Sequence, residues 1–387
     1  MHSNKKILVC PLDWGLGHAA RDVAIVKQLT DLGHEVILAG GGGAMKLLVE
    51  EFPELETVRF GSLIRIRYSR KLPAWMKITL LSPLLLYEVY AEHLRLARLV
   101  RKLRPDVVIS DNRYGLWNQN VTCVLVTHQL SIRLPKFASF LELPAFLAMR
   151  TFISQFDHCW IPDFPGKANL SGDLSHRFPL PGNAVFIGAI SRFTRSDSKF
   201  AESNSNYAGS DSRFSGSGQG NSIPTASPVD LLILLSGPEP QRSRLQKIVL
   251  KQVFSLKARC IILQGLPGKL QRTDLTSTVT MYNHLPSGEL RQLLLASEHV
   301  ICRSGYTSIM DLTIMKKKAL IIPTPGQTEQ EYLAGYLGGK GLFKTCSQDE
   351  LNIESALKDL RQFEADFNQP EGNISGEDLL GAAIKAL

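Results

Sequence analysis

A histidine and two glycines stand together where an apolar run meets a helical pattern, in residues 13–18 (DWGLGH). Gly15 and Gly17 would let a ligand approach the backbone closely, and the helix that follows would offer free N–H groups to an anion. His18, at the mouth of this turn, could act as a general base. An ordinary strand-to-helix turn that needs glycine has the same pattern, so this stretch indicates a site only together with others.

A second stretch, residues 301–334, places polar groups at the starts of two predicted helices. Ser304 and Gly305 open the first helix, where backbone N–H groups suit a diphosphate. Asp311, further along that helix, could accept hydrogen bonds from ribose hydroxyls. The polar run that opens the second helix suits the hydroxyls of a sugar and comprises Glu329, Gln330 and Glu331. Their order favours a nucleotide-sugar site over two ordinary loops.

The elements that must position these groups are short apolar strands alternating with helices. A helix is expected over residues 19–32, with Val23, Val26 and Leu29 on its apolar face. Continuous apolar strands separated by helices indicate α/β parallel sheets covered on both faces, and two such halves predict two Rossmann-like domains facing across a cleft. The expected strands are 6–11, 35–39, 106–110, 123–127, 158–162, 231–235, 259–263, 299–302 and 319–323.

We expect these domains to cover residues 1–160 and 161–387. One segment, residues 196–227, differs in composition from the rest: it is rich in Ser, Gly and Asn and has no periodicity. Such a segment buries too little apolar surface to offset its ordering entropy, so it is predicted to be a flexible insertion.

Charge and cysteine usage limit the partners and the location. The 44 Lys and Arg exceed the 36 Asp and Glu and give a net charge of +8, which suits a nucleotide, a nucleic acid or an acidic membrane surface. A nucleic-acid-binding protein is the distant alternative, suggested by the basic run 95–104, but no aromatic-interleaved motif or zinc-ligand spacing supports it. The six cysteines lack C-x-x-C spacing and are predicted to be buried and reduced. The amino-terminal apolar run is too short for a signal peptide, so we expect a cytoplasmic protein.

Taken together, the motifs resemble those of a known enzyme family. The chain has G-L-G-H after the first strand, Gly188 and Arg192 in G-x-x-x-R, Ser236-Gly237, C-R-S-G at 302–305 and E-Q-E at 329–331. This order resembles the glycosyltransferase-B enzymes, in particular the MurG-like family of bacterial N-acetylglucosaminyl transferases that make lipid II. The resemblance covers nearly the whole chain outside 196–227 and implies the two-domain GT-B fold.

The resemblance also assigns residues to the two sides of the cleft. In the amino-terminal domain it implies an acceptor side that comprises Gly15, Gly17, His18, Tyr114, His128 and Gln129. In the carboxyl-terminal domain it implies a donor side, with Arg192 near the nucleotide, Asp311 in place of a ribose-binding glutamate and Gln330 on the donor sugar. The other donor residues that it implies are Ser236, Gly237, Arg303, Ser304, Gly305, Tyr306, Thr307, Glu329 and Glu331. The chain departs from the family where His128 replaces a carboxylate and Glu331 a second glutamine.

The predicted reaction is metal-independent, inverting transfer of a sugar, with N-acetylglucosamine as one candidate, from a UDP-sugar. No D-x-D motif occurs in the sequence, and helix amino termini and arginines can receive the charge of the departing diphosphate. No cofactor is expected beyond the UDP-sugar substrate. His18 is the first choice as general base, with Asp111, at the end of a predicted strand, and His128 as substitutes. A nucleotide-sugar hydrolase or epimerase on the same scaffold is the alternative.

Residues 63–104 bear on the acceptor. They hold ten Lys and Arg against two Glu, interspersed with Tyr, Trp, Ile and Met. Cations beside aromatic and aliphatic anchors suit an anionic membrane surface, although a core helix with a solvated basic face has the same pattern. The resemblance favours a lipid-linked or glycan acceptor of the cell envelope, and hence a protein held peripherally on the inner face of the cell membrane.

Overall fold

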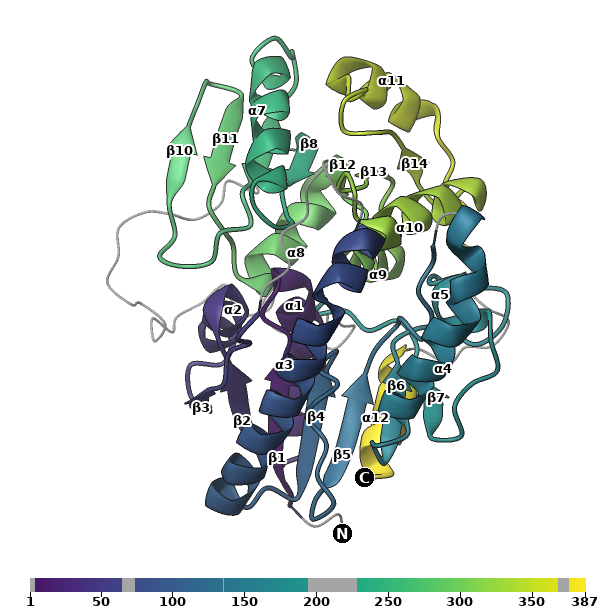
Figure 1. Cartoon of the computed structure of the whole chain (residues 1–387). Helices are drawn as coiled ribbons and strands as arrows, with labels where there is room; N and C mark the ends of the chain where they lie inside the picture. The colour runs from purple at the N-terminus through teal and green to yellow at the C-terminus, as the bar shows by residue number, and fades with distance from the viewer. Residues whose placement is uncertain (1–3, 65–73, 135, 194–227, 368–375) are drawn as a thin grey trace, which may run out of the picture.

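The computed structural model describes residues 4–64, 74–134, 136–193, 228–367 and 376–387. It contains two seven-stranded sheets, each flanked by helices, and Figure 1 shows one sheet below the other. The predicted α/β class with two Rossmann-like halves is confirmed. Residues 196–227, the predicted insertion, lie outside the described residues.

The first sheet has the strand order β3-β2-β1-β4-β5-β6-β7, and all of its strand pairs are parallel. The strand order reverses between β1 and β4, and ligands of such sheets bind at the carboxyl ends of the strands at this switch point. Its strands are β1 (Lys6–Pro11), β2 (Glu35–Gly40), β3 (Glu56–Arg59), β4 (Val107–Asp111), β5 (Thr122–Val126), β6 (His158–Ile161) and β7 (Ala184–Phe186). Its helices are α1 (Leu16–Asp31), α2 (Gly42–Glu51), α3 (Ala74–Leu103), η1 (Lys136–Leu141), α4 (Glu142–Ile153) and α5 (Asp173–His176).

The second sheet has the order β10-β11-β9-β8-β12-β13-β14 and is parallel except where β10 pairs with β11. Its switch point lies between β8 and β12. Its strands are β8 (Val229–Leu234), β9 (Cys260–Leu263), β10 (Arg272–Asp274), β11 (Val279–Tyr282), β12 (Ser297–Arg303), β13 (Ala319–Ile322) and β14 (Lys344–Thr345). Its helices are α7 (Gln241–Val253), α8 (Ser287–Ala296), α9 (Tyr306–Ile314), α10 (Thr328–Gly339) and α11 (Ile353–Gln362), and α12 (Gly376–Lys385) follows.

The expected division at residue 160 needs correction, because it cuts the first sheet. β6 ends at Ile161, and β7, at residues 184–186, pairs with β6 in the same sheet. The carboxyl terminus also returns to the first domain: α12 packs against α1, and Gln28 Nε2 donates to the backbone oxygen of Glu377 at 3.0 Å. The first domain therefore consists of the chain up to β7 together with α12.

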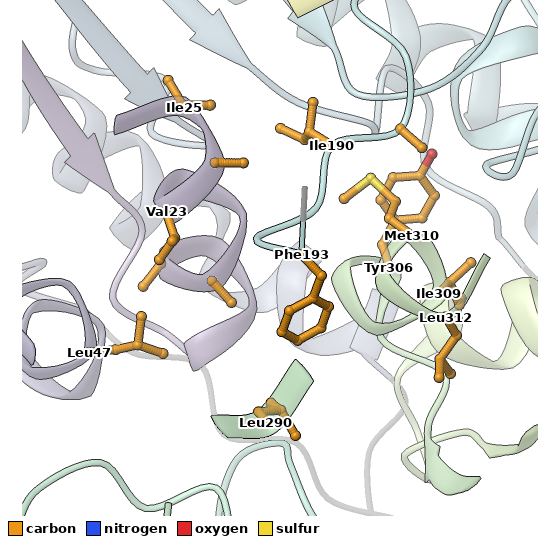
Figure 2. Close-up of a cluster of buried hydrophobic side chains, with 14 of the residues drawn as sticks. Val23, Ile25, Leu47, Ile190, Phe193, Leu290, Tyr306, Ile309, Met310 and Leu312 are labelled. Carbon is orange, nitrogen blue, oxygen red and sulfur yellow. The ribbon is translucent and has the colours of Figure 1, made fainter. Parts of the chain in front are cut away.

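The two domains share one hydrophobic core. A single buried cluster includes residues of α1, α2, α8 and α9, and Figure 2 shows Phe193 lying between α1, which carries Val23, and α9, which carries Ile309. Because α1 and α9 each follow a central strand of their sheet, this packing places the carboxyl ends of the two sheets face to face. The six cysteines are free and all but Cys346 are buried, as predicted. Among the described helices, none is long and apolar enough to cross a membrane.

Candidate active site

His18 lies beside Asp111 at the switch point of the first sheet. His18 is in the first turn of α1, directly after β1, and Asp111 ends the adjacent strand β4. His18 Nδ1 is 3.1 Å from Asp111 Oδ1, and the His18 side chain is 21% exposed whereas Asp111 is fully buried. If Nδ1 donates its proton to Asp111, Nε2 keeps a lone pair, and no residue in the described part of the chain hydrogen-bonds to it. The geometry is that of an imidazole oriented by a carboxylate.

Arg21 holds this carboxylate from one turn further along α1. Its Nε donates to Asp111 Oδ2 at 3.1 Å, a second guanidinium nitrogen contacts Asp111 Oδ1, and the side chain is buried. Burial would raise the pKa of Asp111, but the charges of Arg21 and His18 outweigh it and lower the pKa to about 2. Asp111 is therefore ionised and paired, which suits a residue that orients His18 and not a base in its own right.

Asp22 is a second, unexpected carboxyl in this cluster. It is fully buried, and its oxygens have no hydrogen-bond partner among the described residues. Burial first, and then the charge of Asp111, raise its pKa well above the ordinary range. The two neighbouring carboxyls thus have pKa values shifted in opposite directions, upward for Asp22 and downward for Asp111.

His128 follows β5 and is fixed at both ring nitrogens. Nδ1 lies 3.3 Å from a guanidinium nitrogen of Arg21, and Nε2 lies 3.0 Å from Glu329 Oε1 in the other domain. The His128 ring stacks on Tyr306 with 4.0 Å between centroids and 2° between planes. Burial lowers the pKa of His128 despite the nearby Glu329 carboxylate, and the hydrogen bond from His128 helps to lower the pKa of Glu329. An arginine donor at Nδ1 and a carboxylate at Nε2 suit the tautomer that is protonated at Nε2, and neither nitrogen is free to act as a base.

The predicted acceptor residues are only partly brought together. Gly17 contacts the other domain, since its backbone oxygen accepts from Thr307 Oγ1 at 2.8 Å. Gln129 adjoins His128, and its backbone N–H donates to Thr127 Oγ1. Tyr114 packs edge-on against Phe152, and burial raises its pKa. Gly15 caps α1 with an extended backbone.

Two predicted donor residues, Arg192 and Asp311, meet at the second switch point. Arg192 Nε is 3.6 Å from Asp311 Oδ2, and Ser191 Oγ donates to Asp311 Oδ1 at 2.5 Å. Asp311 is only 4% exposed, and burial raises its pKa to about 6 against the opposing charge of Arg192. Ser191 and Arg192 thus contact its two oxygens, and its role toward a ribose stays a prediction.

Arg303 requires a correction, because the structure turns its side chain into the core. It is fully buried, donates to the backbone oxygens of Pro323 and Gln241 and to Gln348 Oε1, and burial lowers its pKa to about 10. Its side chain therefore joins the end of β12 to the end of β13 and the start of α7, and it is not exposed to a ligand.

The remaining donor-side residues line the ends of β8, β12 and β13. Ser304 is buried and donates to the backbone oxygen of Gln330 at 2.9 Å. Gly305 caps α9, and Gly237 has a φ of +97° that favours glycine in the loop after β8. Ser236 precedes Gly237 in that loop and is half-buried. The amino terminus of α9 and the β8 loop thus present backbone groups at the same sheet edge, as the sequence predicts for a diphosphate site.

Sequence reasoning missed Arg21 and Asp22. Both lie on α1 near His18 and are buried. Two adjacent charged residues beside the buried positions of a predicted helix are the feature of the sequence that could have indicated them. Of the predicted residues, His18, Asp111 and His128 form one cluster with Arg21. In the described part of the chain, no group of three or more His, Cys, Asp and Glu is arranged to hold a metal ion.

Comparisons with known proteins show similarity to glycosyltransferases. Residues 244–378 match the glycosyltransferase family 28 C-terminal domain. Over 88 residues the chain is 36% identical to the UDP-N-acetylglucosamine–N-acetylmuramyl-(pentapeptide) pyrophosphoryl-undecaprenol N-acetylglucosamine transferase of Mannheimia succiniciproducens. That match spans 22% of this chain and 22% of the length of that relative.

Solved structures share the fold over nearly the whole chain. The glycosyltransferase SnogD from Streptomyces nogalater is 16% identical, with 99% of each chain covered and a TM-score of 0.62. The spinosyn rhamnosyltransferase SpnG in complex with thymidine diphosphate is 16% identical, covers 98% of this chain and 95% of its own, and has a TM-score of 0.56. The predicted resemblance to GT-B glycosyltransferases is confirmed: the chain has their fold, and residues 244–378 are similar to the glycosyltransferase family 28 C-terminal domain.

Proposed function

We propose that the protein is a metal-independent, inverting glycosyltransferase that uses a UDP-sugar, with UDP-N-acetylglucosamine as the first donor to test. The observation that carries the proposal is the His18–Asp111 pair, which lies opposite the amino terminus of α9 across the domain junction. A base oriented by a carboxylate on one side and a helix terminus suited to a diphosphate on the other are the two groups that such a transfer requires.

In the proposed reaction, Nε2 of His18 removes the proton of the acceptor hydroxyl. The freed oxygen attacks the anomeric carbon from the face opposite the leaving group, and the bond from that carbon to the diphosphate oxygen breaks. Inversion follows from this single displacement. Asp111 stabilises the imidazolium that forms, and the amino terminus of α9, with Arg192 nearby, receives the charge of the diphosphate.

Donor choice is tested with a panel of UDP-, GDP- and dTDP-sugars in thermal unfolding. A sugar nucleotide present at 100 times its dissociation constant should raise the free energy of unfolding by about 2.7 kcal/mol. We expect a UDP-sugar to give the largest increase in melting temperature. Equal effects of all three classes would contradict the assignment of the nucleotide, and release of free sugar without any acceptor would favour the hydrolase.

A lipid-linked acceptor is the second part of the proposal. Exposed apolar side chains on α3, η1 and α4 support it. In a parallel sheet, the helix after each strand begins at the sheet's carboxyl edge, so α3 and α4 start on the side of the first sheet that faces the second domain (Figure 1). The exposed residues on these helices and on η1 are Leu84, Leu86, Tyr87, Tyr90, Leu94, Phe140, Leu141, Leu143 and Leu147. The relative from Mannheimia succiniciproducens has a pyrophosphoryl-undecaprenol substrate in its name, which is a lipid of this kind.

The lysines and arginines of residues 63–104 are distributed unevenly along the segment. Arg98, Arg101, Lys102 and Arg104 are exposed at the carboxyl end of α3, whereas the two glutamates of the segment, Glu88 and Glu92, are buried. Residues 65–73 lie outside the described residues. The described surface of α3 is thus basic and apolar, as a helix at an anionic membrane surface would be.

Co-sedimentation with anionic vesicles tests this part. We expect the protein to bind phosphatidylglycerol vesicles at low salt and the Leu86→Glu/Leu143→Glu variant to bind less, because a charge replaces an apolar anchor on each helix. Phe254→Ser removes an equally exposed apolar side chain at the end of α7 and is the matched control. If the double variant sediments as the wild type does, the acceptor is to be sought among soluble glycans.

A further inference from the structure

Glu329 stands out because it is the only member of the predicted sugar-binding run 329–331 whose side chain, among the described residues, contacts the other domain. Gln330 Oε1 accepts from the backbone N–H of Thr324 at 2.9 Å, and Glu331 Oε1 accepts from that of Gly326 at 2.9 Å. Both of these bonds stay within the loop before α10. Glu329 Oε1 instead lies 3.0 Å from Nε2 of His128, which follows β5 of the first sheet.

We propose that Glu329 is a positioning residue for the general base and not a ligand of the donor sugar, and that it acts through His128 and Arg21. This inference rests on the proposed glycosyl transfer and names a further residue of that same site.

A continuous series of contacts leads from Glu329 to His18. His128 donates from Nε2 to Glu329 and accepts at Nδ1 from Arg21, at 3.3 Å. The guanidinium of Arg21 in turn donates to both oxygens of Asp111, and one of its nitrogens lies 3.1 Å from His18 Nδ1. Because the guanidinium is planar, its bond to His128 and its bonds to Asp111 constrain one another. Any rotation of the His128 ring therefore disturbs the carboxylate that orients His18.

His128 and the helix that carries Glu329 are both held in place by further contacts. The His128 ring is stacked on Tyr306, whose hydroxyl donates to the backbone oxygen of Pro162 at 2.9 Å. α10 is tied to the start of α5 by Tyr332, whose hydroxyl accepts from the backbone N–H of Asp173, and to the loop before α5 by Tyr336, which donates to Asn169 Oδ1. Glu329 is thus fixed on a helix that is itself anchored to the first domain. It can therefore hold the His128 ring in one orientation.

Removing the Glu329 carboxylate would leave the Nε2–H of His128 without an acceptor. The ring could then turn within its stack on Tyr306 toward another partner, which would weaken its contact with Arg21. A base displaced by about 1 Å from its productive position costs on the order of 100-fold in rate, and a partial displacement costs less. We therefore expect Glu329→Ala to lower kcat about 10- to 100-fold while the KM and Kd of the donor stay unchanged. Glu329→Gln should recover most of kcat, because its amide oxygen can accept from His128.

A double-mutant cycle with His128→Phe, which keeps an aromatic ring against Tyr306, identifies the route of the effect. If Glu329 acts through His128, adding Glu329→Ala to His128→Phe should lower kcat little further. Glu354→Ala, which removes an exposed glutamate of the same domain, is the matched control and should leave kcat unchanged. The variants are compared in the full-length protein at one pH, with turnover and donor affinity measured separately.

Three results would overturn the inference. Additive losses in the cycle would show that Glu329 does not act through His128, and a raised donor KM with kcat retained would return Glu329 to the sugar. Equal losses in Glu329→Ala and Glu329→Gln would show that an acceptor for His128 is not what matters. Each of these results requires an active wild-type protein. Failure of the proposed function is a different outcome: the wild type would then neither bind nor turn over a nucleotide sugar, and the inference would fail as well.

Discussion

Turnover of the nucleotide sugar is expected to fall about 10²- to 10⁴-fold in His18→Ala, with donor affinity unchanged, because a general base contributes in the transition state. His18 is the only histidine of the cluster with an open ring nitrogen, since both nitrogens of His128 have partners. Asp111 cannot take over the role readily, because its pKa of about 2 makes it a weak base. Steady-state kinetics and calorimetric titration of the donor provide the two measurements.

The control for this variant is His158→Gln, which changes a histidine at the start of β6, at the opposite edge of the sheet from the site. We expect its kcat to match the wild type. A loss of donor affinity in His18→Ala as large as the loss of kcat would instead place His18 against the diphosphate. A kcat within a factor of about three of the wild type would exclude His18 as the base.

The free energy of unfolding is expected to fall by about 3–5 kcal/mol in Arg21→Met, because buried Asp111 loses its main counter-charge. Methionine keeps most of the length of the side chain. It also removes the donor to His128 Nδ1. Urea unfolding at pH 7 measures the loss. Arg21→Lys keeps a charge but not the planar set of donors, so it should lose less. In the background of Asp111→Asn, Arg21→Met should cost much less than it does alone, since the carboxylate is gone.

The pH dependence of this loss follows from the lowered pKa of Asp111. A carboxyl with a folded pKa of about 2, below its ordinary 3.8, adds stability that is full above pH 4 and is lost as the pH falls toward 2. In Arg21→Met that stabilisation is missing, so the difference from wild type should be full at pH 7 and shrink below pH 4. A difference that stays constant down to pH 2 would show that packing, and not the ion pair, accounts for the loss.

The amino-acid sequence by itself determines the fold class and the positions of the two turns at which we propose that ligands bind. Short apolar strands must be covered on both faces, and this requirement alone predicts two parallel sheets with helices between their strands. The glycine turn at 15–17 and the Ser304-Gly305 turn mark two strand-to-helix junctions, and both lie at the switch points of the sheets. Local patterns suffice here because each strand-to-helix turn is made by neighbouring residues.

Only the tertiary structure decides which polar side chains meet. Arg21 reaches Asp111 because β1 and β4 pair in the sheet, and His128 reaches Glu329 because the two domains share one core. Arg303, at the end of β12, directly precedes the Ser304-Gly305 turn, yet its side chain turns inward to backbone oxygens. Spacing along the chain cannot encode such contacts, since they depend on strand order, domain packing and the cost of burying a charge without a partner.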